Sequence, residues 1–566
     1  MSPPLTAFDR AVALDRLSSE SFDVLVIGGG ITGAGVALEA GASGLRTALV
    51  ERCDFASGTS SKSSKLVHGG LRYLQQKELA LVHENLVERQ RLLRNAPHLV
   101  EPLPFLVPLF GKGGMADQTI VRAYSVALWM YDLAGGWRIG HRHVKVGADE
   151  VYRHLPALKP DRVVAGFLYY DAKADDARLT LAILRSAVLD HGAVAVNHVA
   201  ATGLLRTAGG RVAGARLETA GDQFEVRASV VVNASGVWAD DVRSLEDGVH
   251  PHSLRPAKGV HLTVPQARMP CDVAAVIPVA ADRRSIFVVP WGDHTYLGTT
   301  DTAYEGPLDD PPVEGGDMDY ILAAVNAVVR DPLRRSDVTG AWAGLRPLLA
   351  SRPGHRRRIS ERTADLSRRH SVLVSHGGLV TVTGGKLTTY RKMAEDTLAE
   401  VGRVMNVRLG PSPTRRLRLR GAEGAASLAR AGAAGTLGID EVTLRHLAGR
   451  YGGETAAVLG LASDRPELLE PLVEGLPYLR AEAVYAVGYE MATTLEDVLA
   501  RRTRAVLLDA PACRRAAGAV ASLIASELGW DEARVAKETD AFGHYLEREL
   551  KAARRDSPGR QPDDEG

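Results

Sequence analysis

Cysteine is scarce in this chain of 566 residues, where Cys53, Cys271 and Cys513 are widely separated and no C-x-x-C pair occurs. Such a set offers neither a disulfide framework nor a cysteine metal site, and it suits a reducing cytosol. An excess of one charge is also lacking, since 69 basic and 68 acidic residues leave a formal net charge of +1. We therefore expect no metal and no nucleic acid as a partner.

Long apolar runs are absent too. No stretch approaches the roughly 20 residues that a membrane-spanning helix requires. The N-terminal residues 1–20 carry acids among the bases and lack a long apolar core, so they make a poor secretory signal. Any contact with a membrane is therefore expected to be peripheral. Hydrophobic and charged contents of 45% and 24% are typical of globular proteins, and the length predicts two or three domains.

The periodicity of the chain predicts an α/β start, a β-rich middle and a helical end. DVLVIG (23–28) and RTALVER (46–52) are short strands on either side of a helix of small residues, which makes one βαβ unit. Residues 175–192 predict a helix with an Asp-rich start. The strand-and-turn pattern from HLTVP through SIFVVPWGDHTYLGTTD indicates an antiparallel sheet, and the Ala- and Arg-rich region after residue 400 is expected to be helical.

A dinucleotide-binding fingerprint lies inside the βαβ unit. Gly28, Gly30 and Gly33 form G-x-G-x-x-G between the first strand and the helix. In this motif the glycines permit a tight turn, close approach of a pyrophosphate and close packing of helix and strand. The pyrophosphate would lie at the helix N-terminus, and Glu51 stands where an acid binds a ribose hydroxyl. The fingerprint does not by itself distinguish FAD from NAD.

A second glycine motif, TVTGGKLTTYRK (381–392), is similar to a phosphate-binding loop without being one. A Walker A loop requires a glycine five residues before its last glycine, and Ser or Thr directly after the lysine. Those positions hold Val380 and Leu387. Lys386 must therefore serve another chemistry.

Five motifs together carry a resemblance to a known family. They are TSSKSSKLVHGGLRYL (59–74), YYDAKADDARL (169–179), VVNASGVWADDV (231–242), GLRPL (344–348) and TGGKLTTYRK (383–392). In this order they resemble the FAD-dependent glycerol-3-phosphate dehydrogenases, and the likeness covers most of residues 20–540. Ser235 replaces the threonine of the family's Ala-Thr-Gly type motif.

The resemblance implies a fold with three parts. These are a glutathione-reductase-like, Rossmann-type FAD-binding domain, an antiparallel β substrate domain and a helical C-terminal cap. We assign residues 20–98, 166–254 and 340–400 to the FAD-binding domain, 99–165 and 255–339 to the substrate domain, 401–550 to the helical domain and 551–566 to a disordered tail.

The resemblance also implies an activity and partners. The family oxidises sn-glycerol 3-phosphate to dihydroxyacetone phosphate by hydride transfer to flavin N5, and it passes the electrons to a membrane quinone. This implies FAD as cofactor and a cytoplasmic protein bound peripherally to the inner face of the cell membrane. A homodimer is an open possibility. The basic clusters at 352–362, 367–370 and 414–421 are candidates for lipid contact, although solvated loops are the favoured interpretation of any one of them.

The residues agree with a phosphorylated substrate, because a phosphate monoester bearing close to two negative charges requires rigidly held cations. By resemblance, the substrate-binding residues are Arg72, Tyr73, Arg346, Arg362 and Lys386. Arg72, Arg346 and Lys386 each stand beside a Gly or Pro turn, whereas Arg362 aligns more loosely. A surface salt bridge is the alternative for any one arginine alone.

The reaction also requires a base for the C2 hydroxyl proton. His261 in AKGVHLTV resembles the family's active-site histidine, and a neutral imidazole suits this role. Lys386 with a lowered pKa is the competing base. The predicted catalytic residues are thus His261, Arg346 and Lys386.

The resemblance places the remaining motif residues around the cofactor. The predicted FAD-binding residues are Gly28, Gly29, Gly30, Ile31, Thr32, Gly33, Glu51, Arg52, Thr59, Ser60, Ser61, Ser64, Lys65, Leu66, His68, Gly69, Gly70, Ala234, Ser235, Gly236, Gly384, Gly385, Leu387 and Thr388. GGKLTTYRK should turn from a strand into a helix whose N-terminus stabilises negative charge on the reduced flavin.

Alternative functions share much of this pattern. A glycerol-3-phosphate oxidase performs the same half-reaction with oxygen as acceptor. An amine or amino-acid oxidase of related fold is disfavoured because its substrates need no phosphate clamp. A non-catalytic flavin-binding protein is disfavoured because Arg72, His261, Arg346 and Lys386 are all present.

Overall fold

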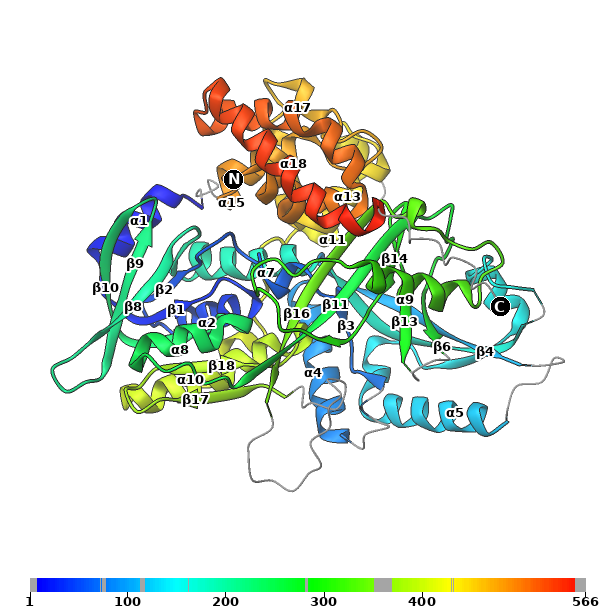
Figure 1. The fold of residues 1–566 in the computed structure, drawn as a ribbon, viewed down its shortest axis with the longest axis horizontal. Helices are drawn as coiled ribbons and strands as arrows, with labels where there is room; N and C mark the ends of the chain where they lie inside the picture. Colours follow the sequence, from blue (N-terminus) through cyan, green and yellow to red (C-terminus); the bar gives the residue numbers. More distant parts are fainter. Residues whose placement is uncertain are drawn as a thin grey trace, which may run out of the picture.

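The fold was analysed in a computed structural model of the chain. The structure describes residues 8–71, 73, 78–111, 118–160, 162–279, 284–350, 369–428, 430 and 432–554. Figure 1 shows two sheets side by side with a group of helices above them. We call these the first sheet, the second sheet and the cap.

Within the described residues, the first sheet has eight strands, and its main path runs β17-β18-β10-β1-β2-β7. The pairs among β18, β10, β1, β2 and β7 are parallel, whereas β17 runs antiparallel to β18 and β8–β9–β10 form an antiparallel extension. The strands are β1 (Phe22–Ile27), β2 (Thr47–Val50), β7 (Val194–Val196), β8 (Ala200–Arg206), β9 (Val212–Thr219), β10 (Asp222–Asn233), β17 (Ser371–Val374) and β18 (Val380–Thr383).

Parallel strands covered by helices read as continuous apolar runs. β1 and β2 do so, and their residues form one core with helix α2. The helices around the two sheets are α1 (Arg10–Ser19), α2 (Ile31–Ala42), α4 (Leu79–Asn95), α5 (Gln118–Leu133), α6 (Ala148–His154), α7 (Asp176–Arg185), α8 (Ala239–Asp247), α9 (Gly315–Asn326) and α10 (Tyr390–Met405).

The second sheet has ten strands within the described residues, and its main path runs β15-β11-β14-β13-β12-β4-β6-β3. It is mostly antiparallel, as predicted, but β12 pairs with β4 in parallel. The strands are β3 (Leu66–Val67), β4 (Val100–Phe110), β5 (Val144–Gly147), β6 (Val163–Ala174), β11 (Leu254–Pro265), β12 (Ala274–Pro278), β13 (Ser285–Trp291), β14 (His294–Gly298), β15 (Thr302–Ala303) and β16 (Gly340–Leu349).

The three ranges that we assigned to the FAD-binding domain, 20–98, 166–254 and 340–400, each contain strands of both sheets. β3, most of β6 and all of β16 lie in these ranges and belong to the second sheet. A strand pattern indicates which residues are extended, but it does not indicate which strand they pair with. The chain therefore passes between the two sheets within each range, and the division into domains stays a prediction.

The cap is helical, as predicted, and has its own apolar core. Its helices are α11 (Ala425–Leu428), α12 (Ala433–Leu437), α13 (Glu441–Tyr451), α14 (Thr455–Gly460), α15 (Arg480–Glu490), α16 (Ala505–Leu508), α17 (Ala510–Leu528) and α18 (Glu532–Arg554). Helix α18 continues four residues beyond the predicted boundary at 550, and 555–566 lie outside the described residues. Among the described helices, none has the length and apolarity needed to cross a membrane.

A buried carboxyl in α18 makes the contact between cap and sheets dependent on pH. Glu549 lies against Lys62, with an Nζ–Oε1 distance of 3.9 Å. Burial raises the pKa of Glu549 to about 7, and the nearby charges of Asp310 and Glu496 act in the same direction, whereas Lys62 and Arg548 oppose them. Between the usual glutamate pKa and 7, the folded protein therefore binds more protons at this site than the unfolded chain.

We expect this group to reduce stability as pH rises from about 4.5 to 7, by at most about 3 kcal/mol, with no further change above 7. Thermal unfolding across this range measures the effect. Glu549→Gln should flatten the dependence, whereas the exposed Glu547→Gln in the same helix should leave it unchanged. An identical slope in Glu549→Gln and the parent protein would refute the assignment.

Candidate active site

The predicted glycine loop joins β1 to α2, as the fingerprint requires. Gly28 has φ +114°, a conformation that side chains other than glycine rarely adopt. Gly30 is the N-cap of α2. A Cβ on Gly33 would lie 1.9 Å from the carbonyl oxygen of Gly28, so strand and helix approach too closely there for any side chain. The loop thus leaves the first backbone N–H groups of α2 facing a pocket, where an anion can bind.

Gly33→Ala should abolish FAD retention, because the added methyl group must push the loop away from α2. We expect protein purified without bound flavin, or a dissociation constant raised by more than about 100-fold, which corresponds to about 3 kcal/mol. Flavin fluorescence released on denaturation measures the occupancy. Gly543→Ala is the matched control, because a Cβ there has no neighbour within 4 Å. Full flavin content in Gly33→Ala would contradict the prediction.

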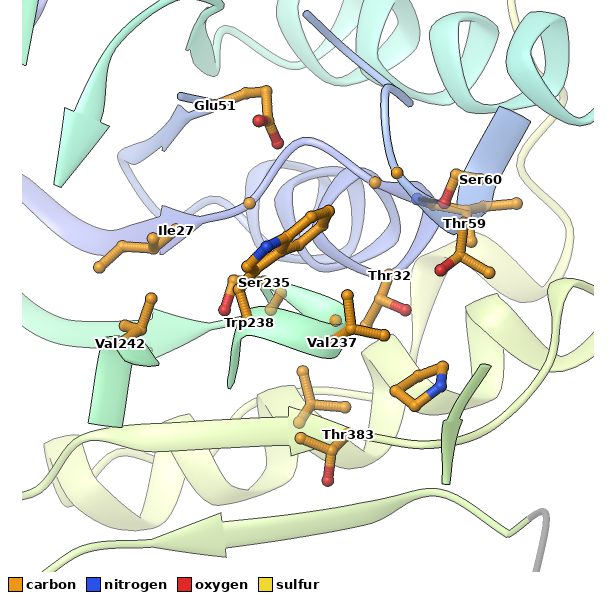
Figure 2. Close-up of a pocket in the computed structure, with 18 of the residues that line it drawn as sticks. Ile27, Thr32, Glu51, Thr59, Ser60, Ser235, Val237, Trp238, Val242 and Thr383 are labelled. Carbon is orange, nitrogen blue, oxygen red and sulfur yellow. Dashed lines mark hydrogen bonds between the residues drawn. The ribbon is translucent and has the colours of Figure 1, made fainter. Parts of the chain in front are cut away.

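A single elongated pocket gathers most of the predicted cofactor residues (Figure 2). Those that line it are Gly28, Gly30, Ile31, Thr32, Glu51, Arg52, Thr59, Ser60, Ala234, Ser235, Gly236, Gly384, Gly385 and Leu387. Lys386 and Pro347 line the same pocket, and Pro347 directly follows Arg346. The pocket therefore runs from the end of β2 past the glycine loop to the turn after β18.

Polar groups hold the pocket walls in place. The carboxylate of Glu51 accepts hydrogen bonds from the backbone N–H of Gly29 at 2.7 Å and of Cys53 at 2.9 Å. The Ser60 hydroxyl accepts one from the N–H of Ile31 at 2.8 Å, which ties the 59–61 turn to the start of α2. Burial raises the pKa of Glu51, and the two backbone donors oppose this shift.

The residues around the pocket fit a flavin dinucleotide. The glycine loop provides a cradle that a side chain would fill, and Glu51 stands beside it for a ribose. The indole of Trp238 projects into this region (Figure 2), and its buried Nε1–H has no hydrogen-bond partner among the described residues. A buried donor of this kind requires an acceptor, which a bound cofactor can supply.

The second glycine motif forms the predicted strand–turn–helix. β18 ends at Thr383, Gly384 and Gly385 have φ of +75° and +79°, and a 3₁₀ turn at Leu387–Thr389 leads into α10. The ammonium of Lys386 lies 3.8 Å from the centre of the Tyr73 ring. The backbone N–H of His68 donates to the Thr388 hydroxyl at 3.2 Å, so the 59–70 segment meets this turn.

His261 and Arg346 lie on one face of the second sheet. In the pairing of β11 with β16, His261 faces Trp342, Gly259 faces Gly344, and Ala257 faces Arg346. Because side chains alternate along a strand, these residues share one face. The two glycines between them allow close packing, because a Cβ on Gly259 would meet the guanidinium of Arg346 and one on Gly344 would meet the backbone of Lys62.

His261 is buried among aromatic and polar groups. Its Nε2 lies 2.8 Å from the Ser64 hydroxyl, and its ring stacks on Trp342 with a centroid distance of 4.8 Å. The other ring nitrogen, Nδ1, is buried without a hydrogen-bond partner among the described residues. Burial lowers the pKa of His261 well below its usual value, and the charges of Lys65 and Arg346 act in the same direction. The imidazole is therefore neutral at physiological pH and can accept a proton.

Arg346 is held by acceptors on the segment after β14. Its guanidinium lies 3.2 Å from a carboxylate oxygen of Asp301 and 3.4 Å from the carbonyl oxygen of Thr300. A Cβ on Gly259 would lie 2.6 Å from its Nη2, so the side chain reaches back along the sheet toward His261. The structure thus places a fixed cation on the face that carries the candidate base.

Several predicted site residues do not line the pocket. They are Gly29, Gly33, Ser61, Ser64, Lys65, Leu66, His68, Gly69, Gly70 and Thr388. The side chain of Lys65 is directed elsewhere, because its ammonium binds Asp176 at 3.0 Å and the carbonyl oxygen of Ser61 at 3.2 Å. Burial lowers the pKa of this lysine to about 8. Arg72 and Arg362 lie outside the described residues.

The sequence did not point to part of the pocket. Trp238, Val199 and Ala200 line it without having been predicted. Trp238 is the second residue after the NASG motif, so its position was a usable signal. Val199 and Ala200 come after β7, where parallel strands of the first sheet end at one edge, and only the strand order brings them to the pocket.

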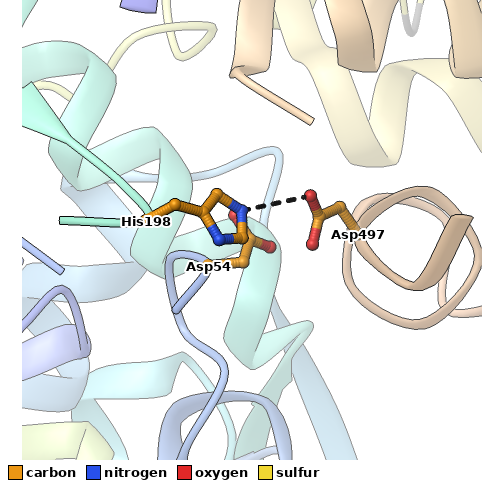
Figure 3. Close-up of side chains that lie close together, drawn as sticks. All are labelled: Asp54, His198 and Asp497. Carbon is orange, nitrogen blue, oxygen red and sulfur yellow. Dashed lines mark ion pairs between the residues drawn. The ribbon is translucent and has the colours of Figure 1, made fainter. Parts of the chain in front are cut away.

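A second cluster of titratable side chains lies between the first sheet and the cap. Asp54, His198 and Asp497 converge there (Figure 3), with His198 Nε2 3.6 Å from a carboxylate oxygen of Asp497. Arg501 and Arg502 each lie 2.6 Å from the carboxylate of Asp54. A metal ion would have to displace these guanidinium groups, so the cluster serves as an ion-pair contact that joins the cap to the first sheet.

Comparison with protein families gives two matches. Residues 23–391 match the model of the FAD-dependent oxidoreductase family, and residues 412–535 match the C-terminal domain of alpha-glycerophosphate oxidase. The first match covers the glycine loop, both sheets and the turn after β18. The second covers most of the cap.

Relatives of known identity extend over nearly the whole chain. Glycerol-3-phosphate dehydrogenase 2 of Mycobacterium tuberculosis is 43% identical over 554 residues, which cover 96% of this chain and 91% of the relative. The mitochondrial glycerol-3-phosphate dehydrogenase of Bos taurus is 37% identical over 96% of this chain and 75% of its own. The glycerol-3-phosphate dehydrogenase of Bacillus halodurans, solved with FAD, superposes with a TM-score of 0.76 at 31% identity and covers 97% of this chain and 100% of its own.

These matches confirm the resemblance drawn from the five motifs, with FAD as the cofactor. The pocket, its glycine loop and the paired sheets have the arrangement that an FAD-dependent oxidoreductase fold requires. The chain belongs to the family of FAD-dependent glycerol-3-phosphate dehydrogenases.

Proposed function

We propose that this protein oxidises sn-glycerol 3-phosphate to dihydroxyacetone phosphate, with FAD held in the pocket between the glycine loop and the turn after β18. One observation carries the proposal. His261 and Arg346 share one face of the second sheet, and Pro347, next to Arg346, lines the same pocket as Lys386. This supports a site in which a neutral base and two cations act on a phosphorylated alcohol.

When bound, FAD would accept at its N5 atom the hydride that leaves C2 of the substrate. His261 takes the proton of the C2 hydroxyl, so that carbon–hydrogen and oxygen–hydrogen bonds break and a carbonyl group forms. Ser64 holds the imidazole through the 2.8 Å contact with Nε2. Lys386 is the alternative base, and its place beside Tyr73 on the turn after β18 keeps it at the pocket.

The phosphate group is bound by fixed cations. We assign this role to Arg346 and Lys386, together with Arg72, Tyr73 and Arg362 from the sequence. Asp301 and Thr300 orient the guanidinium of Arg346, which reduces the conformational entropy lost when the substrate binds. The N-terminus of the 387–389 turn, leading into α10, stabilises negative charge on the reduced cofactor.

The arrangement of the FAD-binding part is proposed to be of the glutathione-reductase type, with three discontinuous segments. The parallel strands of the first sheet, with α2 against them, support this comparison. We propose that the remaining predicted cofactor residues contact the lining residues and hold them in position around the flavin.

The proposed electron acceptor is a quinone, reached by peripheral association with the inner face of the cell membrane. The alternative is an oxidase that reduces oxygen, which the match of the cap to an alpha-glycerophosphate oxidase domain keeps open. The oxidase of Mycoplasma pneumoniae shares only 17% identity at a TM-score of 0.53 and indicates the fold alone. Hydrogen peroxide released in stoichiometric amount during turnover would favour the oxidase.

Anaerobic reduction of the bound flavin tests the proposal. Purified holoprotein mixed with glycerol 3-phosphate should lose its yellow colour within the dead time or seconds of mixing, whereas glycerol should leave it oxidised. A quinone analogue added afterwards should restore the colour. Flavin that stays oxidised with glycerol 3-phosphate would overturn the proposed reaction.

A further inference from the structure

Helix α5 (Gln118–Leu133) presents an apolar face to solvent. Val126, Trp129, Met130 and Leu133 have exposed fractions of 59%, 51%, 37% and 78%. Their spacing of three and four residues puts them on one side of the helix. Trp137, 55% exposed, continues the patch in the next turn (Gly136–Ile139). We call these five residues the α5 patch.

The opposite side of α5 is already buried. Val121, Leu128 and Tyr131 pack into an apolar core with α4, β4 and β6. The exposed side chains are therefore not required to attach the helix to the protein. In Figure 1, α5 lies at the lower edge of the molecule, below β4 and β6 and far from the cap. An exposed apolar face on a helix whose other face is already buried indicates a surface that binds a partner.

The exposed charges of the α5 segment are basic. Between residues 118 and 147 the only acidic residue is Asp132, which is buried and lies 2.7 Å from Nδ1 of His143. Arg122, Arg142 and Lys145 are exposed in the same segment. An apolar stripe with basic groups in the same segment is complementary to an anionic lipid surface, where the apolar side chains enter the acyl boundary and the cations meet the headgroups.

Exposed tryptophans add to this match. Trp129 and Trp137 are the two exposed residues among the six tryptophans of the chain. Indole rings favour the membrane–water interface because one part of the ring is apolar and the N–H is polar. The basic cluster at 414–421 is less suitable, since Arg415 pairs with Glu395 and Arg420 pairs with Glu454 and Asp190.

We propose that the α5 patch, with its surrounding cations, is the surface by which this protein lies on an anionic lipid bilayer. The assignment builds on the peripheral membrane association put forward above and names the surface that makes it. α5 lies parallel to the bilayer plane, with Trp129 and Leu133 inserted and Arg122, Arg142 and Lys145 at the headgroups. The part of the second sheet that contains β4 and β6 then lies nearest the membrane.

Vesicle binding of the full-length holoprotein tests the proposal. Cosedimentation with phosphatidylcholine vesicles that contain phosphatidylglycerol should exceed that with phosphatidylcholine alone and should weaken as salt is raised. Trp129→Ser with Leu133→Ser should lower the partition coefficient by about tenfold or more. Arg122→Glu with Lys145→Glu should lower it on anionic vesicles only. Lipids with brominated acyl chains should quench the fluorescence of the parent protein.

Two matched controls isolate the patch. Val249→Ser with Val442→Ser removes exposed apolar groups elsewhere, and Arg416→Glu with Arg418→Glu reverses charge on the 414–421 segment. Both should bind vesicles as the parent protein does. Flavin reduction by glycerol 3-phosphate without vesicles should be unchanged in every variant, which separates failure of the surface from failure of the proposed reaction.

Three results would overturn the assignment. The first is equal binding by the parent protein and the Trp129→Ser, Leu133→Ser variant. The second is absence of any binding to anionic vesicles. The third is a parent protein that sediments as a dimer while this variant sediments as a monomer, because a second copy of the chain would then cover the patch.

Discussion

Replacing His261 by Asn should slow anaerobic flavin reduction by glycerol 3-phosphate roughly 10²- to 10⁴-fold, the usual contribution of a positioned general base. The amide keeps a polar side chain of similar size but cannot accept the C2 proton. The loss should appear in the limiting rate at saturating substrate, because the base acts in the chemical step. Stopped-flow absorbance of the flavin measures it directly.

The surroundings of His261 fix its protonation state and its position. Burial lowers the pKa of the imidazole well below its usual value, which keeps the ring neutral but also makes it a weaker base. The stacking on Trp342 and the contact with Ser64 fix the ring, so little reorganisation is needed before proton transfer. Ser64→Ala should loosen the ring and give a smaller loss than His261→Asn.

A buried histidine elsewhere in the same sheet provides the control. His294 on β14 is also buried, and burial likewise lowers its pKa. His294→Asn should fold, retain flavin and reduce it at the parental rate. If flavin is reduced in His261→Asn as fast as in the parent protein, His261 is not the base. Lys386 would then be assigned this role, and Lys386→Met should lower the rate of flavin reduction.

Replacing Arg346 by Met should lower the second-order rate constant of flavin reduction by about 10²-fold or more, mainly through weaker substrate binding. The guanidinium is a fixed cation held by Asp301 and Thr300 on the face that carries His261. Methionine keeps the apolar part of the side chain and removes the charge. Flavin reduction followed over a wide range of glycerol 3-phosphate concentrations separates binding from the chemical step.

Two further variants sharpen this result. Arg346→Lys keeps the charge but loses the planar fork of donors, so it should restore only part of the activity. Arg268→Met removes an arginine in the turn after β11 that pairs with Asp337 and does not line the pocket, and it should behave as the parent protein. An unchanged apparent affinity for glycerol 3-phosphate in Arg346→Met would show that this arginine does not bind the phosphate.

Local backbone requirements made part of this fold predictable. The glycine loop and the strand–turn–helix around Lys386 each depend on glycines with positive φ. Both structures lie where the motifs predicted them. A strand that ends, a tight turn and a helix that begins involve residues within one short segment. The amino-acid order therefore carries enough information to locate them.

Pairings between distant segments were not predictable in the same way. β6 and β16 have ordinary strand patterns, and only their partners β4 and β11 show that they belong to the second sheet. Lys65 lies in a motif typical of cofactor binding, yet its ammonium meets Asp176, which is 111 residues away. The exposure of the apolar face of α5 likewise became visible only in the tertiary structure.

The sequence by itself determined the family, the cofactor class and the two glycine turns, because these depend on short motifs with strict backbone demands. The tertiary structure alone decided which strands meet, that His261 and Arg346 share one sheet face, and that Trp129 of α5 is exposed to solvent. The physical reason is the range of the forces involved. Backbone conformation is set by neighbours in the chain, whereas burial and charge pairing depend on whichever distant residues the fold brings into contact.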